Sequence, residues 1–169
     1  MHAARLGVTG AASNEKEEHV KRQVISTDSG PRTGLPYSQA IRHGDVVYVA
    51  GQVALDPATG QVVTGGIREQ TQRVLQNVEA ILGAAGTSLA HAVECLCLLH
   101  DIGDFAAFNE AYKGFFPKDP PARTTVQAVL PRPGLLVEIR VVAAMPPPRA
   151  AAHAAKPARK APAKGRRRR

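Results

Sequence analysis

Cysteine is scarce in this sequence, and no stretch is as long and apolar as a membrane helix requires. The only two cysteines, Cys95 and Cys97, supply no disulfide framework, so we expect a reducing compartment. No segment approaches the roughly 18 consecutive apolar residues of a transmembrane helix. Residues 1–20 also lack the apolar block of a secretory signal. We therefore expect a soluble, cytoplasmic protein that does not bind membranes.

The residues that usually bind metal ions are not grouped along this sequence. The six histidines are scattered, and the two cysteines have no further ligands at the spacing of a metal site. Cys95 and Cys97 stand two residues apart in an apolar run, so on a strand they share one face. We interpret them as small buried apolar groups and predict neither a metal site nor a cofactor.

Acidic residues are absent from residues 149–169, which contain nine lysines and arginines. The rest of the chain holds 13 basic and 14 acidic residues and is close to neutral, although the whole chain carries a formal charge of +8. A segment rich in Ala, Pro, Lys and Arg cannot form a core, so we predict that residues 146–169 are a disordered tail. Because the tail has no aromatic residues for base stacking, we expect it to bind the phosphates of nucleic acids or other polyanions regardless of base sequence. The alternative is a solvated tail that binds polyanions only weakly.

The remaining sequence predicts one α+β domain at residues 22–145, preceded by a disordered extension at residues 1–21. Strands are predicted at residues 22–27, 37–42, 45–50 and 93–99, and a closing hairpin at 124–130 and 135–144. A helical period places Ile67, Thr71, Val74, Val78, Ile81 and Leu82 on one face of a helix that begins near Gly66 and stops at Gly83 or Gly86. Asp104 is the predicted N-cap of a second helix, whose aromatic stripe we assign to the core.

This order of elements leaves one face of the predicted sheet without a cover. Two helices can cover one face only, yet residues 46–50 and 135–142 are apolar nearly throughout. Such runs indicate strands that are buried on both faces. A closed homo-oligomer is the simplest way to cover the second face, and it would place pockets between subunits.

Two charged residues stand where charges are costly to bury. Arg123 lies where a loop becomes a strand, and Glu138 lies inside an otherwise apolar strand. A guanidinium group is shaped to hold a carboxylate by two parallel hydrogen bonds, so the two residues suggest a pocket for a small acid. The alternative is a structural ion pair, or two separate charges at a sheet edge.

Several short motifs, in order, resemble the Rid superfamily, also called the YjgF-like or reactive-intermediate deaminase family. The resemblance covers about residues 22–144 and is carried by Gly34–Ala40, Val49–Gln52 with Asp56–Gly60, Gln76–Val78, Asp104–Asn109, Pro121–Thr124 and Val137–Ile139. It implies a chorismate-mutase-like fold, with a mixed sheet and two helices on one face. It also implies a homotrimer with a site at each subunit interface.

The resemblance further implies hydrolysis of 2-imino acids and their enamine tautomers to 2-keto acids and ammonia, without a cofactor. Arg123 matches the arginine that binds the substrate carboxylate, and Glu138 matches the acid that orients or activates water. Tyr37 and Asn109 match polar groups of the same pocket, and Gly51 the place where the backbone approaches the ligand.

Two positions depart from the family pattern and keep other functions open. Ala50 stands where many members carry serine, and Thr125, which we also place in the substrate pocket, stands where many carry cysteine. Neither binds the carboxylate in this scheme, so we expect activity to survive while substrate preference changes. The alternatives are a non-catalytic sensor or chaperone that binds small carboxylates, or a nucleic-acid-associated protein acting through residues 149–169, including a ribonuclease.

Overall fold

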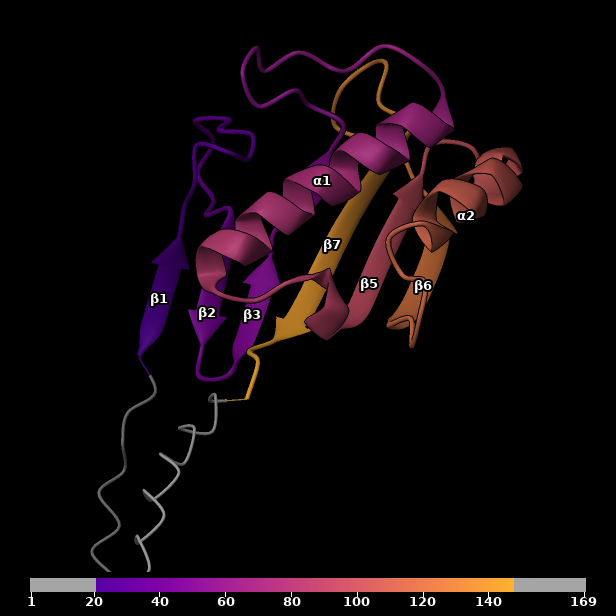
Figure 1. Cartoon of the computed structure of the whole chain (residues 1–169). Coiled ribbons are helices and arrows are strands. Elements are labelled where there is room, and N and C mark those ends of the chain that lie inside the picture. Colours follow the sequence, from indigo (N-terminus) through magenta and orange to yellow (C-terminus); the bar gives the residue numbers. More distant parts are fainter. Residues whose placement is uncertain (1–20, 148–169) are drawn as a thin grey trace, which may run out of the picture.

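The computed structural model describes residues 21–147, which form a sheet with two α-helices (Figure 1). The strands are β1 (Arg22–Ile25), β2 (Ala40–His43), β3 (Val46–Val49), β4 (Gln52–Val53), β5 (Ala92–Leu99), β6 (Ala122–Gln127) and β7 (Val137–Ala144). The helices are α1 (Ile67–Ala85) and α2 (Phe105–Lys113), with the short 3₁₀ helices η1 (Leu89–His91) and η2 (Ile102–Asp104).

The sheet is mixed, and its strand order is β1-β2-β3-β7-β5-β6, with β4 also paired to β7. Only the β5–β6 pair is parallel; every other pair is antiparallel. The predicted closing hairpin is wrong, because β7 inserts between β3 and β5 and does not pair with β6. The parallel β5–β6 pair requires a crossover, and α2 supplies it.

Helix α1 follows the predicted period and ends. All six residues of its predicted stripe are buried, and fully burying an aliphatic side chain such as those of Ile67 and Leu82 stabilises the fold by about 1.5–3 kcal/mol. At its start, the Glu69 carboxylate accepts a hydrogen bond of 2.8 Å from the Gly66 backbone N–H. At its end, Gly86 adopts the left-handed conformation with φ 85°, which a side chain would disfavour. The glycine boundaries predicted from the sequence are therefore confirmed.

Helix α2 begins where the sequence predicts, but its expected cap is not formed. Asp104 occupies the N-cap position and its side chain makes no capping hydrogen bond. The Asp101 carboxylate instead accepts a 2.8 Å bond from Gly103 N–H in the preceding η2 turn. Phe108 and Tyr112 of the aromatic stripe are buried as predicted, whereas Phe105 is 40% exposed.

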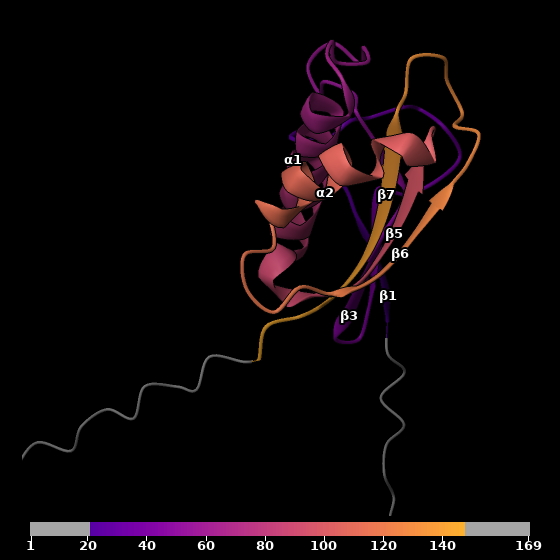
Figure 2. The same ribbon diagram turned by 90° about the vertical axis from the view of Figure 1, so that its right-hand side faces the viewer.

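Both α-helices pack on the same face of the sheet, so the fold has two layers (Figure 2). The buried core fills the space between them, and β7 contributes Val137, Ile139, Val141 and Ala143 to it. Cys95 and Cys97 of β5 are buried in the same core, as predicted, and both are free thiols. The predicted fold class, an α+β mixed sheet with two helices on one face, is confirmed.

Within residues 21–147 no helix covers the opposite face of the sheet (Figure 2). Apolar side chains are exposed on that face. Register places Val24, Tyr48 and Val126 on this open face, and they are 54%, 49% and 42% exposed within the protomer. One ion pair crosses the same face, between Arg140 of β7 and Glu94 of β5 at 3.2 Å. The uncovered apolar face is the one for which the sequence predicts a partner subunit.

The segment before α1 differs from the prediction at Tyr37 and at β4. Tyr37 was expected to begin a strand but lies in the loop before β2, and the short strand β4 was not predicted. The predicted disorder of residues 1–20 and 148–169, and the polyanion binding assigned to residues 149–169, lie outside the described residues. No helix within residues 21–147 is long and apolar enough to cross a membrane.

Candidate active site

Glu138 is a half-buried carboxylate on the open face of the sheet. Its neighbours on β7 alternate between buried and accessible, and Glu138 points away from the helix-covered core. It is flanked by Val53 of β4 and Leu98 of β5. Within residues 21–147 its carboxylate has no hydrogen-bond or ion-pair partner, and burial raises its pKa above the ordinary glutamate value. An unpaired, partly desolvated carboxylate of this kind is suited to accept a proton.

Gly51 lies directly against this carboxylate. A Cβ atom built on Gly51 would overlap Glu138 Oε1, and its next nearest atoms would also belong to Glu138. The missing side chain therefore leaves the space in which the carboxylate sits. The family resemblance implied that Gly51 lies near the ligand; the structure shows that it lies against Glu138.

A cavity of about 750 Å³ contains both Glu138 and Gly51. Tyr37 also lines it, with a half-exposed side chain whose hydroxyl oxygen accepts a 3.0 Å hydrogen bond from Thr33 Oγ1. Ala50 lines the same cavity, so the missing serine hydroxyl leaves an apolar wall there. We refer to this cavity as the acid pocket. The apolar Leu35, Val53 and Leu55 complete much of its wall.

Arg123 lies on the other face of the sheet, under helix α2. Its guanidinium carbon is 4.7 Å from the ring centre of Tyr112, 5.3 Å from Phe108 and 5.7 Å from Phe105. Cation–π contacts of this kind hold the planar guanidinium in place without using its hydrogen-bond donors. Within residues 21–147 Arg123 has no ion pair, so its donors are available to an anion.

Asn109 shares a second cavity, of about 450 Å³, with Arg123. Asn109 comes from α2 and is partly exposed, and Pro120 and Pro121 close the cavity where the chain enters β6. We refer to this cavity as the arginine pocket. It joins the two predicted residues that can donate hydrogen bonds to a carboxylate, a guanidinium and an amide.

Thr125 follows Arg123 on the same face of β6 but does not line either pocket. It pairs in register with Cys97, and its Oγ1 is buried without a hydrogen-bond partner within residues 21–147. Burial raises the pKa of the Cys97 thiol to about 12, so that thiol stays protonated at neutral pH. In the protomer, Thr125 is part of the packing beneath the arginine pocket.

The two pockets do not meet within one chain. Arg123 pairs across β5 with Cys95, whereas Glu138 pairs with Leu98, three residues further along. That offset is about 10 Å along the strands and about 10 Å across them, so the two Cα atoms are about 14 Å apart. The two side chains also leave opposite faces of the sheet. The structure thus brings together Tyr37, Gly51 and Glu138, and separately Asn109 and Arg123.

Sequence reasoning missed two groups of residues around these pockets. The α2 rings were assigned to the core, and nothing in their spacing indicates that they contact an arginine on β6. Two further arginines, Arg32 and Arg132, line the acid pocket and were not selected. A signal for Arg132 exists, because it stands between Pro131 and Pro133, which restrict its backbone.

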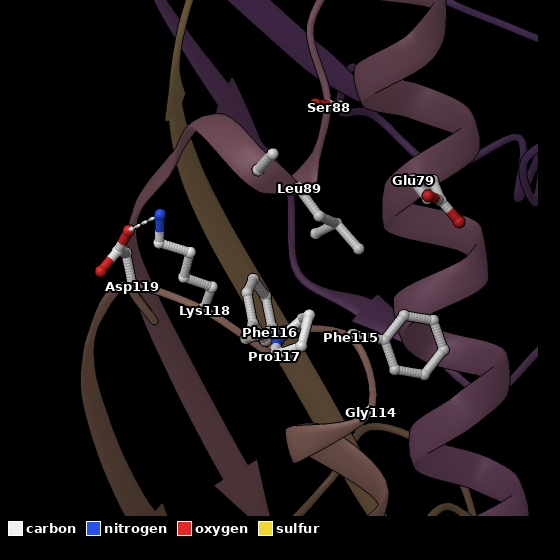
Figure 3. Close-up of a pocket in the computed structure, with 10 residues that line it drawn as sticks. Glu79, Ser88, Leu89, Gly114, Phe115, Phe116, Pro117, Lys118 and Asp119 are labelled. Atoms are coloured by element: carbon white, nitrogen blue, oxygen red, sulfur yellow. Dashed lines mark ion pairs between the residues drawn. The ribbon is translucent and has the colours of Figure 1, made fainter.

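A third cavity, of about 460 Å³, lies between α1, η1 and the loop after α2 (Figure 3). Leu89, Phe115 and Phe116 form much of its wall, and Lys118 pairs with Asp119 at 3.7 Å on its rim. None of the predicted site residues lines it. Residues 21–147 also contain no group of three or more His, Cys, Asp or Glu side chains placed to hold a metal ion.

Comparison with known protein families adds an independent observation. The family described as "Endoribonuclease L-PSP" matches residues 27–145. A mouse protein named 2-iminobutanoate/2-iminopropanoate deaminase is 44% identical over 127 residues, covering 75% of this chain and 93% of that protein. A RutC family protein of Pyrococcus abyssi is 43% identical over 122 residues, covering 72% of this chain and 96% of that protein.

Solved structures agree with the fold. A Rid family protein of unknown function from Yersinia pestis superposes with a TM-score of 0.71 at 37% identity, covering 74% of this chain and 100% of that one. The structure of Escherichia coli TdcF with bound serine gives a TM-score of 0.69 at 33% identity, covering 73% of this chain and 99% of that one.

Proposed function

Because this chain belongs to the Endoribonuclease L-PSP family, the family of the YjgF and Rid proteins, we propose that it hydrolyses reactive 2-imino acids to 2-keto acids and ammonia. The substrates would include 2-iminobutanoate and 2-iminopropanoate and their enamine tautomers. The observation that carries the proposal is that the part of the chain described by the structure leaves an arginine unpaired in one pocket and a carboxylate unpaired in another.

We propose that the site is completed between subunits of a cyclic homotrimer. The open face needs a cover, and Arg123 and Glu138 cannot reach one another within a chain. A heterologous contact joins two different surfaces and closes into a ring, so each interface can place the arginine pocket of one subunit against the acid pocket of the next. Burial of Val24, Tyr48 and Val126 would help to drive this contact.

In the assembled site Arg123 binds the substrate carboxylate through two parallel hydrogen bonds. The α2 rings hold the guanidinium in one orientation, so binding the carboxylate also fixes the position of the imine carbon. Asn109 donates an additional hydrogen bond from the same pocket. The serine bound to TdcF supports this assignment, since an amino acid carries the same α-carboxylate as the imino acid.

Glu138 then acts as the general base. It takes a proton from water as the water oxygen bonds to the imine carbon, and it passes this proton to the imine nitrogen, which gives a carbinolamine. Glu138 then takes the hydroxyl proton of the carbinolamine as the C=O bond forms, and it delivers that proton to the nitrogen, which leaves as ammonia when the C–N bond breaks. The pKa of Glu138 is raised by burial, which brings the base closer to the working pH. Tyr37 lines the same pocket and orients the water or the substrate.

A coupled assay tests the proposal directly. An amino-acid oxidase or a threonine dehydratase generates 2-iminobutanoate, and a trapping agent reports how fast the imine is lost. The wild-type protein should accelerate the loss, and Arg123→Ala should not. Arg68→Ala is a matched control, because Arg68 is an exposed residue of α1 outside all three pockets. Equal rates with wild type and Arg123→Ala would remove the enzymatic claim.

The same samples separate catalysis from simple binding. A carboxylate sensor would be stabilised against unfolding by 2-ketobutanoate and yet would not accelerate imine loss. The deaminase should show both effects, and both should disappear in Arg123→Ala.

A further inference from the structure

The loop between β6 and β7 carries an arginine to the acid pocket. Arg132 stands between Pro131 and Pro133, whose rings restrict the backbone on both sides of it. Pro131 and Arg132 both line the acid pocket with Glu138, and Arg132 is exposed to solvent. The arginine therefore lines the same pocket as the proposed base and is not buried by the protomer.

The buried Gln70 side chain of α1 forms hydrogen bonds to the backbone of this loop. Gln70 is 2% exposed; its Nε2 donates a 2.8 Å hydrogen bond to the Gly134 carbonyl, and its Oε1 accepts a 2.8 Å bond from Leu136 N–H. Two hydrogen bonds to one buried amide, together with the prolines, keep the backbone of Arg132 in a defined position. The backbone of a loop held in this way loses little conformational freedom when its arginine binds an anion.

The charges around the acid pocket leave Arg132 unmatched. Glu138 is the one acidic residue among the described residues that line the pocket. Arg32, the other cation there, makes a 2.6 Å ion pair with Asp28. Arg132 has no ion pair within residues 21–147. The apolar Leu35 adds room beside the charged groups.

We propose that Arg132 is a specificity-determining residue that binds a second, side-chain carboxylate of the substrate. This inference rests on the proposed function, with the α-carboxylate held by Arg123 of the neighbouring subunit. A 2-imino acid whose side chain extends across the acid pocket would place its terminal carboxylate at Arg132. The substrate class is therefore the 2-imino dicarboxylates, formed by oxidation of acidic amino acids, and they are preferred over imino acids with short apolar side chains.

The experiment compares two substrates in one assay. Imines are generated in the presence of the trapping agent by an oxidase for acidic amino acids acting on aspartate or glutamate, and by one acting on alanine or 2-aminobutyrate. Wild type should show the higher kcat/KM for the dicarboxylic imine. In Arg132→Ala the ratio of dicarboxylic to monocarboxylic kcat/KM should fall about tenfold, the effect of one charge-assisted interaction.

Charge reversal and conservative replacement sharpen this test. Arg132→Glu should lower the ratio further than Arg132→Ala. Arg132→Lys, which keeps the charge but not the planar guanidinium, should keep part of the ratio, and Arg68→Ala should leave it unchanged. Thermal unfolding confirms that each variant folds. If wild type lacks the preference, or if Arg132→Ala leaves the ratio as it was, the inference is wrong and the deaminase proposal stands. If wild type accelerates the loss of neither imine, both proposals are wrong.

Discussion

Replacing Gly51 with alanine tests whether the position of the Glu138 carboxylate matters. The new Cβ atom would overlap Glu138 Oε1. Real Cβ atoms essentially never come closer than 3.0 Å to another heavy atom, so the carboxylate oxygen would have to move away by about 1 Å. Gly51 has an ordinary backbone conformation, so the strain can be relieved by the side chain. A displacement of about 1 Å at a catalytic group costs on the order of 100-fold in rate. We therefore expect kcat/KM for 2-iminobutanoate to fall about 100-fold.

The assay is the coupled imine-loss measurement, accompanied by thermal unfolding. Gly51→Ala should unfold within a few degrees of wild type, because the carboxylate can turn toward solvent. Gly83→Ala, in helix α1, is the matched control. A Cβ atom at Gly83 meets no neighbouring atom within 4 Å, so activity should be unchanged. The free energy of unfolding should rise by about 0.5–1 kcal/mol, because alanine favours a helix more than glycine does. An unimpaired Gly51→Ala enzyme would refute the reasoning that Glu138 must sit where the structure places it.

Three further predictions address the proposed base and the strand beside it. In the substrate-bound enzyme the substrate carboxylate offsets the Arg123 charge, so burial should still hold the pKa of Glu138 above 4.5. We expect kcat to fall as the pH drops through this pKa, because the base becomes protonated. Glu138→Gln, which has no base, should be inactive at every pH. The raised pKa means that the folded protomer holds this proton more tightly, so the contribution of Glu138 to stability is present at acid pH and lost as the pH rises through the folded pKa. In an Arg123→Ala background, which removes the neighbouring positive charge, Glu138→Gln should therefore be more stable than its parent at pH 7 but not at pH 4, as denaturant titrations can measure. Asn77 is 1% exposed and its Nδ2 donates to the carbonyls of Val53 and Leu55, so Asn77→Ala should lower the free energy of unfolding by about 1–3 kcal/mol in the same titrations.

Local signals in the sequence predicted the elements, but strand order depended on contacts between distant segments. The period and the flanking glycines of α1 define that helix, because both act over a few residues. The turn at residues 131–134 has the composition of a hairpin, yet β7 lies between β3 and β5. Nothing in the local sequence of β7 indicates that it pairs with β3 and β5 in preference to β6.

The residues of the proposed site could be chosen from the sequence, but their relative positions could not. Arg123 and Glu138 were selected because charges in those settings need partners, and neither has an ion-pair partner within residues 21–147. Their placement on opposite faces follows from strand register, which the sequence does not reveal. The contact of Arg123 with the α2 rings also depends on how the crossover packs.

The central claim is that one subunit supplies Arg123 and the next supplies Glu138. Arg123→Ala and Glu138→Ala should each be inactive alone. When equal amounts are unfolded together and refolded, random assembly into a ring gives about one interface in four with both groups intact, so about a quarter of the activity of refolded wild type should return. Activity that stays at the level of the separate variants, from mixed assemblies of normal size, would contradict a site shared between subunits.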